Sequence, residues 1–550
     1  MPRVCEFQNV RVYIHVGSPN NMFIFVILFY FISTLILSTV LLCKHQYRRL
    51  FMLTLLVLFL TLFWYLWSPV HFGPVSVLKS EDRPAINQDE VRNWGDTVAC
   101  TPRTIYKPDT IPDIQHIVNE ADNVRVVGGG HSWTPLICSN EVVMSLSCNF
   151  LLKNNASTAT FDAGCSIMQA QEYLMKYDKQ LHGYGSIQVQ TLAGAFMTAL
   201  HGVQPLSFAS DVLELQAVLA NGTLLTTRNI DMWQGSMGML GIVVRMTFNI
   251  YPSKSVKVEE RSVSLTEVLS VMGKEGLVGM DAKTIWGNTE DVYNLRLFSE
   301  PMEEKISLTH PITFDSFLHD NILLPTLLTL SRIVYLLPVA RWYYPTYLVN
   351  REFITNAWYR YPEFGFKSAA YAIPIEKCSQ ALLDIRQVAA GHLVTVELRY
   401  LESAPGCLSW VQTPSCIVDT SYIDASVTNF DQQVVSYHQE VEKLVSSYGG
   451  NPHWGKYYAS PYAMLNMPCM AKFKNFRAEV DPSNKFLNTF TRAVLSGERG
   501  TYFASAIQER AGLYRFVHLL VVVFILLLYL CPTNQGRQAR FKYSLLKSQR

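Results

Sequence analysis

The two ends of the chain carry long uncharged apolar stretches, whereas its middle alternates short apolar runs with polar turns. Residues 22–43 contain no charged side chain. At about 1.5 Å per residue, a helix of this length crosses a hydrocarbon layer of about 30 Å. Residues 50–67 are also uncharged and end in the aromatic side chains Trp64, Tyr65 and Trp67, which are typical of a membrane interface. The pattern predicts a transmembrane hairpin over residues 22–70, after an N-terminal segment of residues 1–21.

A third apolar stretch, residues 516–531, predicts a C-terminal transmembrane helix, and residues 532–550 form a tail with basic but no acidic side chains. Basic residues also separate the first two stretches, at Lys44, Arg48 and Arg49. Because basic loops stay cytoplasmic, three crossings place the middle of the chain in the lumen or outside the cell. We expect an integral protein of the endoplasmic reticulum or another secretory-pathway membrane, in contact with the lipid bilayer.

Two apolar segments allow other interpretations. A cleaved signal peptide is the alternative for residues 22–43, but this stretch is longer than the usual apolar region of such a peptide, and a second one follows it. Residues 321–349 are interrupted by prolines and arginines. Because these residues are costly within a bilayer, we expect buried helices or a face that contacts lipid rather than a crossing.

The cysteines fit an oxidising compartment. Eight of the eleven lie in the middle region, where disulfides would form. Cys407 and Cys416 could close a small loop, and a buried free thiol is the alternative for each cysteine. Sequons for N-glycosylation occur at Asn155 and Asn221, although so short a motif often arises by chance. No Cys-x-x-Cys pair occurs, so neither a zinc ribbon nor a thioredoxin-type site is predicted, and we expect no metal site.

The composition argues against a disordered protein and against a nucleic-acid-binding protein. Charged residues make up 16% of the chain and hydrophobic residues 49%, values far from those of disordered proteins. The net charge of +2 argues against a nucleic-acid partner. A chain of 550 residues exceeds one compact core, so at least two folding units are expected.

The middle region carries both helix and strand patterns. Apolar residues at helical spacing predict helices over residues 111–121 and 167–177, and small residues predict a further helix that reaches His201. Alternating or β-branched runs predict strands over residues 101–106, 124–127, 211–219, 224–227, 242–250 and 395–400. Asn221-Gly222 is typical of a type I′ hairpin turn. This mixture predicts the α+β class.

Three glycines, Gly128 to Gly130, follow the strand expected over residues 124–127. Glycines in this position let backbone amides approach a ligand closely and hold a pyrophosphate, although a tight turn alone would explain them. Trp133 stands where a dinucleotide fingerprint requires its third glycine, so a nicotinamide-binding Rossmann site is disfavoured.

Five separated motifs agree in order with one family. They are Val127-Gly-Gly-Gly-His131-Ser132, Thr191-Leu-Ala-Gly194 with His201-Gly202, Gly238-Met-Leu-Gly241-Ile242-Val243, Val396-Glu397-Leu398-Arg399-Tyr400 and His453-Trp454-Gly455-Lys456. From residue 93 to residue 490 the chain resembles the aldonolactone oxidases, flavin oxidases of the vanillyl-alcohol oxidase type that include gulonolactone and arabinonolactone oxidase. The resemblance implies a two-lobed FAD-binding module over residues 91–251 and a cap domain with an antiparallel sheet over residues 252–495.

The resemblance also implies FAD as the cofactor, bonded covalently through His131 to the 8α-methyl group of the flavin. The further cofactor contacts that it implies are Val127, Gly128, Gly129, Gly130, Ser132, Ser186, Thr191, Gly194, Thr198, His201, Gly241 and Ile242. The structural alternative for His131 is a side chain that lies against the cofactor without a bond.

Four residues are expected to carry the chemistry. Glu397 and Arg399 are two apart on a strand, so both project from the same face. Such a pair is usually only an ion pair, but over a flavin it would clamp a sugar. By resemblance Lys456 would orient the substrate, and His453 would support it. We expect oxidation of a sugar lactone to a pre-ascorbate type product, with dioxygen reoxidising the flavin.

The chain departs from the residue pattern of the family at two positions, and three alternative functions are considered. Ala370 replaces the acidic residue usual before Tyr371-Ala-Ile-Pro374, and Leu200 replaces a threonine. The alternatives are an oxidase or dehydrogenase of alditols or other alcohols, a catalytically silent membrane flavoprotein, and a serine hydrolase. The last is disfavoured because Gln234 occupies the first glycine position of a nucleophile elbow around Ser236.

Overall fold

The computed structural model describes residues 86–497 with gaps at residues 88, 95–97, 149–150, 155–156, 186, 254–256, 287–291, 300–366, 391, 393, 405, 423–429 and 459–466. The chain separates into two units, Met1–Val75 and Ser76–Arg550, and every described residue belongs to the second. The stretches expected to cross a membrane, residues 22–43, 50–67 and 516–531, lie outside the described residues. No helix among the residues that are described has the length and apolar character of a membrane span.

The first lobe of the FAD-binding module contains a parallel sheet in the order β4 (Thr104–Tyr106), β6 (Val142–Met144) and β5 (Val124–Val126). Helix α3 (Ile111–Glu120) joins β4 to β5, as predicted. Thr110 and Asp113 cap its N-terminus reciprocally, and Pro112 fits the first turn because no N–H partner is needed there. A small antiparallel sheet precedes this lobe: β1 (Ile86–Asn87), β2 (Glu90–Arg92) and β3 (Ala99–Cys100).

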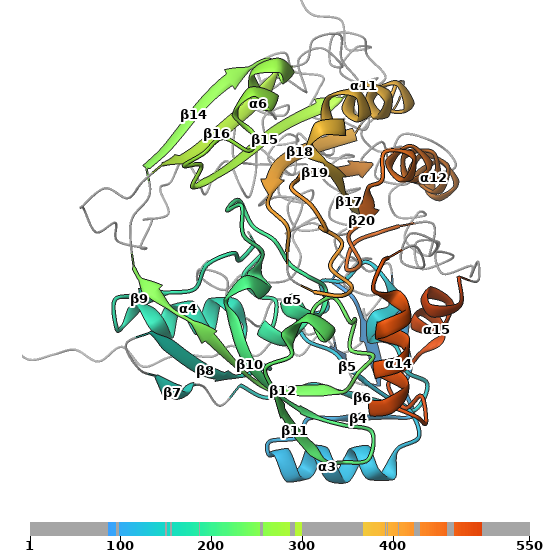
Figure 1. Ribbon diagram of the computed structural model, residues 1–550. Helices are drawn as coiled ribbons and strands as arrows, with labels where there is room; N and C mark the ends of the chain where they lie inside the picture. Colours follow the sequence, from blue (N-terminus) through green and yellow to red (C-terminus); the bar gives the residue numbers. More distant parts are fainter. Residues whose placement is uncertain are drawn as a thin grey trace, which may run out of the picture. The chain divides into compact units, whose positions relative to one another are not determined.

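The second lobe is a five-stranded antiparallel sheet with two helices (Figure 1). Its strand order is β11 (Leu224–Thr227), β10 (Val212–Val218), β12 (Ile242–Asn249), β8 (Thr158–Asp162) and β7 (Leu151–Asn154). The helices are α4 (Ile167–Met175) and α5 (Leu192–Met197). A two-stranded ladder of β9 (Lys179–Gln180) and β13 (Tyr251–Pro252) leads from this lobe toward the cap domain.

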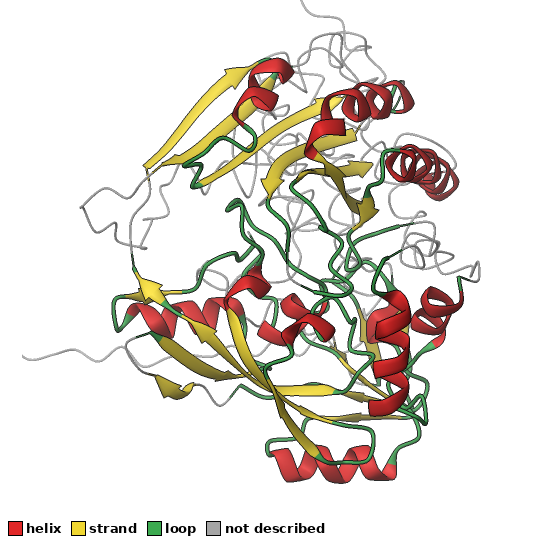
Figure 2. Cartoon of the chain, in the orientation of Figure 1, coloured by secondary structure: helices red, strands yellow, loops and turns green. Residues whose placement is uncertain are grey.

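The cap domain is built on a seven-stranded antiparallel sheet, drawn in yellow in the upper part of Figure 2. Its order is β14 (Lys257–Val263), β16 (Tyr293–Ser299), β15 (Gly279–Trp286), β18 (Val394–Leu401), β19 (Ser415–Tyr422), β17 (Lys367–Pro374) and β20 (Asn451–Pro452). Among the described residues, helices α6 (Leu265–Val271), α11 (Cys378–Val388) and α12 (Phe430–Ser447) accompany the sheet. The chain is therefore α+β, as its pattern predicts.

The end of the described chain returns to the FAD-binding module. Helices α14 (Met470–Val480) and α15 (Thr489–Ser496) lie beside the first lobe in Figure 1, although the sequence assigns them to the cap domain. The amide of Asn123 donates to the carbonyls of Lys485 and Leu487 at 3.0 and 2.6 Å. Arg125 is buried, and its guanidinium donates to the carbonyl of Phe486 at 2.6 Å. This segment therefore completes the core of the first lobe.

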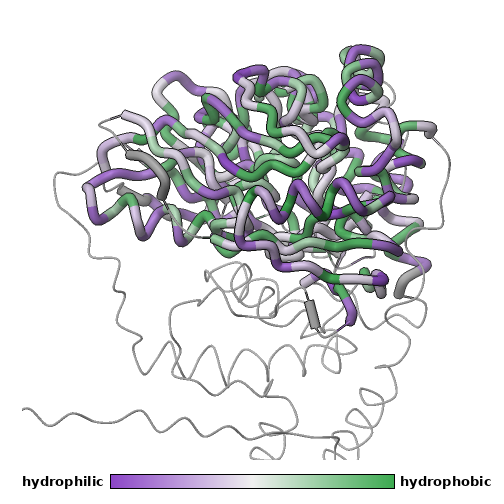
Figure 3. The backbone as a smooth tube through the Cα atoms, turned by 90° about the horizontal axis from the view of Figure 1, so that it is seen from below, coloured by the Kyte–Doolittle hydropathy of each residue, from purple (hydrophilic) through white to green (hydrophobic). Residues whose placement is uncertain are grey.

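One hydrophobic core extends across both domains. It joins Phe196 and Met237 of the FAD-binding module to Leu408 and Trp454 of the cap domain. In Figure 3 hydrophobic stretches run through the interior of the described chain, and hydrophilic residues are common toward its outer edges. Because apolar burial is the main favourable term in folding, this shared core holds the two domains together.

Two local predictions are wrong in detail. Asn221-Gly222 lies in a hairpin loop, but only Gly222 has a positive φ, of 75°, whereas a type I′ turn needs two such residues. The amide of Gly222 donates to the carbonyl of Leu219, and a longer loop results. The helix expected to reach His201 ends at Met197. The cause is Ala199, whose φ of 54° cannot continue a right-handed helix.

All eight cysteines of the middle region are paired, but not as proposed. The disulfides are Cys100–Cys138, Cys148–Cys165, Cys378–Cys416 and Cys407–Cys469. The suggested loop between Cys407 and Cys416 is therefore wrong. Cys416 is buried on β19 and bonds to the start of α11, whereas Cys407 belongs to the core shared by the two domains.

Candidate active site

A cavity of about 460 Å³ is lined by both the FAD-binding module and the cap domain. The module contributes the glycine-rich turn after β5 and the N-terminal end of α5. The cap contributes one face of β18 and β19 and the loop after β20. The predicted residues that line it are Val127, Gly128, Gly129, Gly130, His131, Ser132, Thr191, Gly194, Thr198, His201, Gly241, Ile242, Glu397, Arg399, His453 and Lys456. Ser186 lies outside the described residues.

The glycine-rich turn packs closely against the segment that leads into α5. A Cβ atom on Gly128 would collide with the side-chain oxygen of Thr191, and one on Gly129 would lie 2.9 Å from the carbonyl oxygen of Val189. Thr191 is the N-cap of α5 and accepts a hydrogen bond from the amide of Gly194 at 3.2 Å. Only residues without a side chain allow these two segments to approach so closely.

His131 follows this turn and stacks on Trp94, with the ring centroids 5.5 Å apart. Burial lowers the pKa of its imidazole to about 4. At neutral pH the ring is therefore uncharged, and one ring nitrogen keeps a free electron pair. An uncharged imidazole held in the cavity wall is suited to form a bond with an electrophilic carbon of a ligand.

The residues of the cavity fit FAD. Backbone amides of the glycine-rich turn suit a pyrophosphate, and the apolar side chains of Val127, Met197 and Ile242 suit flat aromatic rings. The side-chain oxygen of Gln190 is buried at the same cavity without a hydrogen-bond partner among the described residues. A buried polar atom of this kind needs a partner, and a ligand amide or hydroxyl would supply one.

The loop from His453 to Lys456 joins the two domains at the cavity. The amide of Trp133 donates to the carbonyl of Gly455 at 2.9 Å, and the amide of His453 donates to the carbonyl of Ala370 at 2.8 Å. A Cβ atom on Gly455 would lie 2.8 Å from the Cβ of Thr198. Burial lowers the pKa of His453 to about 3, so this histidine is a neutral packing group.

Glu397 and Arg399 project from the same face of β18, as the alternating pattern predicts. One guanidinium nitrogen of Arg399 donates to Glu397 at 2.5 Å, and Lys283 on β15 lies 3.7 Å from the same carboxylate. Burial alone would raise the pKa of Glu397, but the charges of Arg399, Lys283 and Lys456 outweigh it and lower the pKa to about 2. Glu397 is therefore an anion that accepts hydrogen bonds at any ordinary pH.

Lys456 forms an ion pair with Asp419 at the other end of this face. Burial lowers the pKa of the ammonium to about 7, and the charge of Arg399 contributes, while Glu397 opposes the shift. The Asp419 carboxylate in contact with the ammonium also favours its charged form. Burial lowers the pKa of His201, and the charges of Arg399 and Lys456 lower it further, so His201 is neutral.

The sequence prediction missed five polar residues of this face that also line the cavity, namely Lys283, Ser368, Thr395, Asp419 and Ser421. Asp419 is the direct cross-strand partner of Glu397 on one side and of Ala370 on the other. The acid that the resemblance leads one to expect at Ala370 is thus absent there, and a carboxylate reaches the same face from the adjacent strand. The alternation of side chains along β19 indicates which residues share a face with Asp419. Only the pairing of β19 with its neighbours shows that this face is the one with Glu397.

Known proteins share both parts of this architecture. The family model described as FAD binding domain matches residues 102–228, and the one described as D-arabinono-1,4-lactone oxidase matches residues 246–494. The L-gulonolactone oxidase of Mus musculus is 24% identical over 443 residues, which cover 74% of this chain and 98% of that protein. The L-gulono-1,4-lactone dehydrogenase of Mycobacterium tuberculosis is 24% identical over 440 residues, or 73% of this chain and 98% of that protein.

A solved structure supports the fold. Cholesterol oxidase from Brevibacterium sterolicum superposes with a TM-score of 0.57 at 15% identity, over 78% of this chain and 100% of that chain. The two family models match consecutive regions that coincide with the glycine-rich module and the cap domain. Together with these relatives, the two matches support the assignment of the chain to the aldonolactone oxidase family of FAD-dependent oxidoreductases.

Proposed function

We propose that this protein is a membrane-anchored oxidase of sugar-1,4-lactones, of the L-gulono or D-arabinono type, which passes the electrons to dioxygen and releases hydrogen peroxide. One observation carries the proposal. The turn that fits FAD and the charged face of Glu397, Arg399 and Lys456 line the same cavity. A hydroxylated ring in this cavity would therefore meet hydrogen-bond acceptors, donors and positive charge at once.

FAD, when bound, supplies the acceptor for a hydride from the carbinol carbon of the lactone. The residues of the chain bind and orient the substrate. Glu397 accepts hydrogen bonds from sugar hydroxyls, because its carboxylate stays ionised. Arg399 and Lys456 stabilise the negative charge that develops on the substrate oxygen as its proton leaves. His453 and His201 are neutral and support the cavity wall by packing against Trp410.

A substrate panel tests the activity. The detergent-solubilised protein is mixed with L-gulono-1,4-lactone, D-arabinono-1,4-lactone and several alditols, and hydrogen peroxide and oxygen uptake are measured. We expect the lactones to react fastest, with one peroxide formed per lactone. Faster oxidation of alditols supports the alternative specificity. Turnover with an artificial acceptor but not with dioxygen would make the protein a dehydrogenase, and no reaction at all would make it a silent flavoprotein.

We propose that FAD is bonded covalently to His131. Support comes from the uncharged ring at the cavity, next to the glycine-rich turn. The protein is denatured and separated from small molecules, and flavin fluorescence is followed. We expect fluorescence to remain with the wild-type polypeptide and to be released from His131→Ala. Release from both proteins would show that the cofactor is held without a bond.

The lumenal location of the catalytic region is also a proposal. It is supported by the four disulfides, because thiols are kept reduced in the cytosol. Asn221 is exposed in the loop between β10 and β11 and heads a sequon. If the region enters the secretory pathway, glycosidase treatment should increase the gel mobility of the wild type but not that of Asn155→Gln/Asn221→Gln. A protein without glycans, with all eight thiols accessible to alkylation, would contradict this location.

A further inference from the structure

Asp419 is a second carboxylate on the catalytic face. It lies on β19, directly opposite Glu397 on β18, and both side chains reach the cavity. One of its oxygens accepts a hydrogen bond from the hydroxyl of Ser368 at 3.1 Å, and the other contacts the ammonium of Lys456. The side chain of Asp419 is 15% exposed and that of Lys456 is 21% exposed. Both side chains are thus largely buried, and both residues line the cavity.

The backbone fixes this arrangement independently of the side chains. Ser368 is on β17, the strand paired with β19, and its carbonyl accepts a hydrogen bond from the amide of Tyr457 at 2.8 Å. The carbonyl of Ala370 on the same strand accepts from the amide of His453 at 2.8 Å. The loop that carries Lys456 is therefore attached at both ends to the strand beside Asp419, and the two side chains meet because the sheet brings them together.

The arrangement of charges on this face indicates that Asp419 favours the protonated form of Lys456. Among the described residues of this face that line the cavity, three are cations, Lys283, Arg399 and Lys456, and two are anions, Glu397 and Asp419. Lys283 also lies 3.8 Å from the carboxylate of Asp281, which is outside the cavity lining. The carboxylate of Glu397 already forms ion pairs with the guanidinium of Arg399 at 2.5 Å and with the ammonium of Lys283 at 3.7 Å. Without Asp419, burial and the neighbouring cations would favour a neutral amine at Lys456. Asp419 is the carboxylate that contacts Lys456 among the described residues.

We propose that Asp419, oriented by Ser368, is a positioning residue that keeps Lys456 charged and directed into the cavity. The inference rests on the proposed function, because it concerns how Lys456 assists the FAD-dependent reaction. Asp419 acts through Lys456 and need not touch the substrate. Its loss would thus resemble a partial loss of Lys456.

The test uses the flavin-loaded full-length protein and five variants. Asp419→Asn keeps the shape of the side chain but removes its charge, and Ser368→Ala removes only the orienting hydroxyl. Lys456→Met removes the ammonium, and Asp419→Asn/Lys456→Met removes both members of the pair. Asp384→Asn is the matched control, because Asp384 is a cap-domain carboxylate on α11 that bonds to Tyr448 outside the cavity.

Two readouts are followed over a range of pH. The first is the rate at which L-gulono-1,4-lactone bleaches the bound flavin without oxygen. The second is the dissociation constant of sulfite, which adds to oxidised flavin as an anion and so senses nearby positive charge without any turnover. Both readouts should weaken as pH rises and Lys456 loses its proton. The flavin absorbance spectrum of each variant reports whether the site is assembled.

We expect Asp419→Asn to weaken sulfite binding roughly tenfold at neutral pH. It should also move the pH transition down by about one unit, because the carboxylate no longer stabilises the ammonium. Ser368→Ala should shift both readouts in the same direction by less. The double variant should equal Lys456→Met. An Asp419→Asn protein that behaves like Asp384→Asn, or a double variant in which the two effects add, would overturn the proposal. Sulfite binding decides the matter even if no lactone is oxidised.

Discussion

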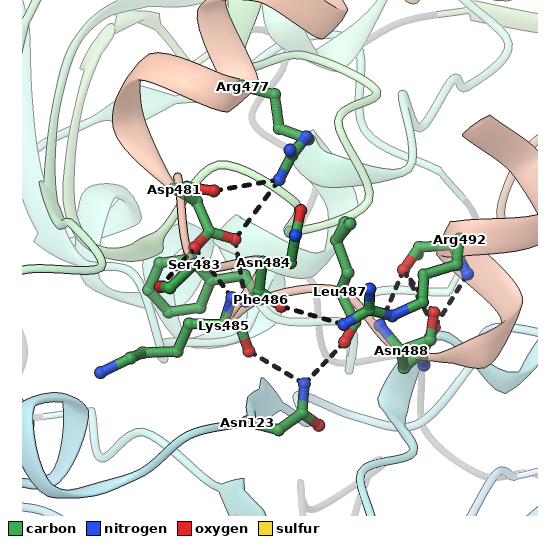
Figure 4. A network of polar contacts seen from close by, with 12 residues as sticks. Asn123, Arg477, Asp481, Ser483, Asn484, Lys485, Phe486, Leu487, Asn488 and Arg492 are labelled. Atoms are coloured by element: carbon green, nitrogen blue, oxygen red, sulfur yellow. Dashed lines mark hydrogen bonds and ion pairs between the residues drawn. The ribbon is translucent and has the colours of Figure 1, made fainter. Parts of the chain in front are cut away.

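Two buried ionic clusters in this protein have opposite roles. At the end of α14, the carboxylate of Asp481 is fully buried and accepts hydrogen bonds from the amides of Lys485 and Phe486 at 2.8 and 3.0 Å (Figure 4). Ser483 donates to it at 3.3 Å, and Arg477 lies 3.6 Å away. All these partners come from one stretch of chain. The carboxylate thus holds a loop in shape and reaches no ligand.

The face of β18 and β19 is arranged differently. Glu397, Arg399, Lys456 and Asp419 come from three separate elements of the cap domain, and all four border the cavity. Their partners among the described residues are mainly other charged side chains, together with the hydroxyl of Ser368. A charged group whose hydrogen bonds are completed by its own loop is structural, whereas charges gathered around a cavity remain available to a ligand. Burial alone does not separate the two cases.

The largest effect should come from Arg399→Met. Loss of this guanidinium removes positive charge from the site of negative-charge development, and turnover should fall by about 10²–10³-fold. Folding should also suffer, because breaking a buried ion pair costs about 3–5 kcal/mol. Steady-state rates corrected for flavin content measure the first effect, and thermal unfolding measures the second. Unchanged turnover with a full complement of flavin would exclude the proposed role of Arg399.

Asp481→Ala should lower the stability of the protein but leave its turnover unchanged. It leaves two buried amides without an acceptor, at about 1–3 kcal/mol each, so the unfolding midpoint in denaturant should fall clearly. The folded fraction should keep its turnover number, because Asp481 is outside the cavity lining. Denaturant titration with parallel rate measurements checks both statements. A variant of normal stability but low turnover would break the distinction between the two clusters.

The pH dependence of kcat/KM should depend on the charged residues at the cavity and not on the cluster around Asp481. Burial, with the charge of Arg399, lowers the pKa of Lys456 from 10.5 to about 7, so its positive charge is present below this range and is lost as pH rises through it. kcat/KM should therefore fall on the alkaline side, as pH rises through about 7. In Lys456→Met the rate should be lower and this alkaline fall should disappear. An identical profile in wild type and variant would assign the transition to another group.

The smallest effect should come from Ser483→Ala. This change removes one donor to Asp481 and leaves the two backbone amides in place, so the expected loss of stability is about 0.5–1.5 kcal/mol. Turnover and its pH profile should not change. Ser368→Ala, which removes the corresponding hydroxyl from Asp419, is the matched comparison, since it should alter the pH profile. Equal profiles in the two serine variants would mean that both clusters are structural.

Local features of this fold were readable from the residues alone. Pro112 lies in the first turn of α3, near the predicted start of the helix, and the alternation around Glu397 and Arg399 places both on one face. These signals act within a few residues, where the chain's own geometry decides the outcome. The glycine-rich turn at Gly128 is of the same kind, because the need for close backbone approach leaves a visible mark on composition.

Features that depend on contacts between residues far apart in the sequence could not be predicted from the sequence. Asp419 joins the site only through its register with Glu397 and Ala370, and nothing near it in sequence indicates a partner. Cys407 bonds to a cysteine 62 residues away rather than to the nearer Cys416, because the two face different parts of the core. The left-handed Ala199 that ends α5 is likewise imposed by packing, since the buried Trp410 donates to its carbonyl at 3.1 Å.

The return of the last described helices to the first lobe has a consequence for how the protein is made. Arg125 and its acceptor Phe486 are 361 residues apart, so the ribosome must complete almost the whole described region before that guanidinium meets its final carbonyl. A nascent chain would hold an incomplete nucleotide-binding lobe for most of its synthesis. A premature stop codon just before α14 should therefore abolish cofactor loading, even though every residue of the catalytic face would have been translated.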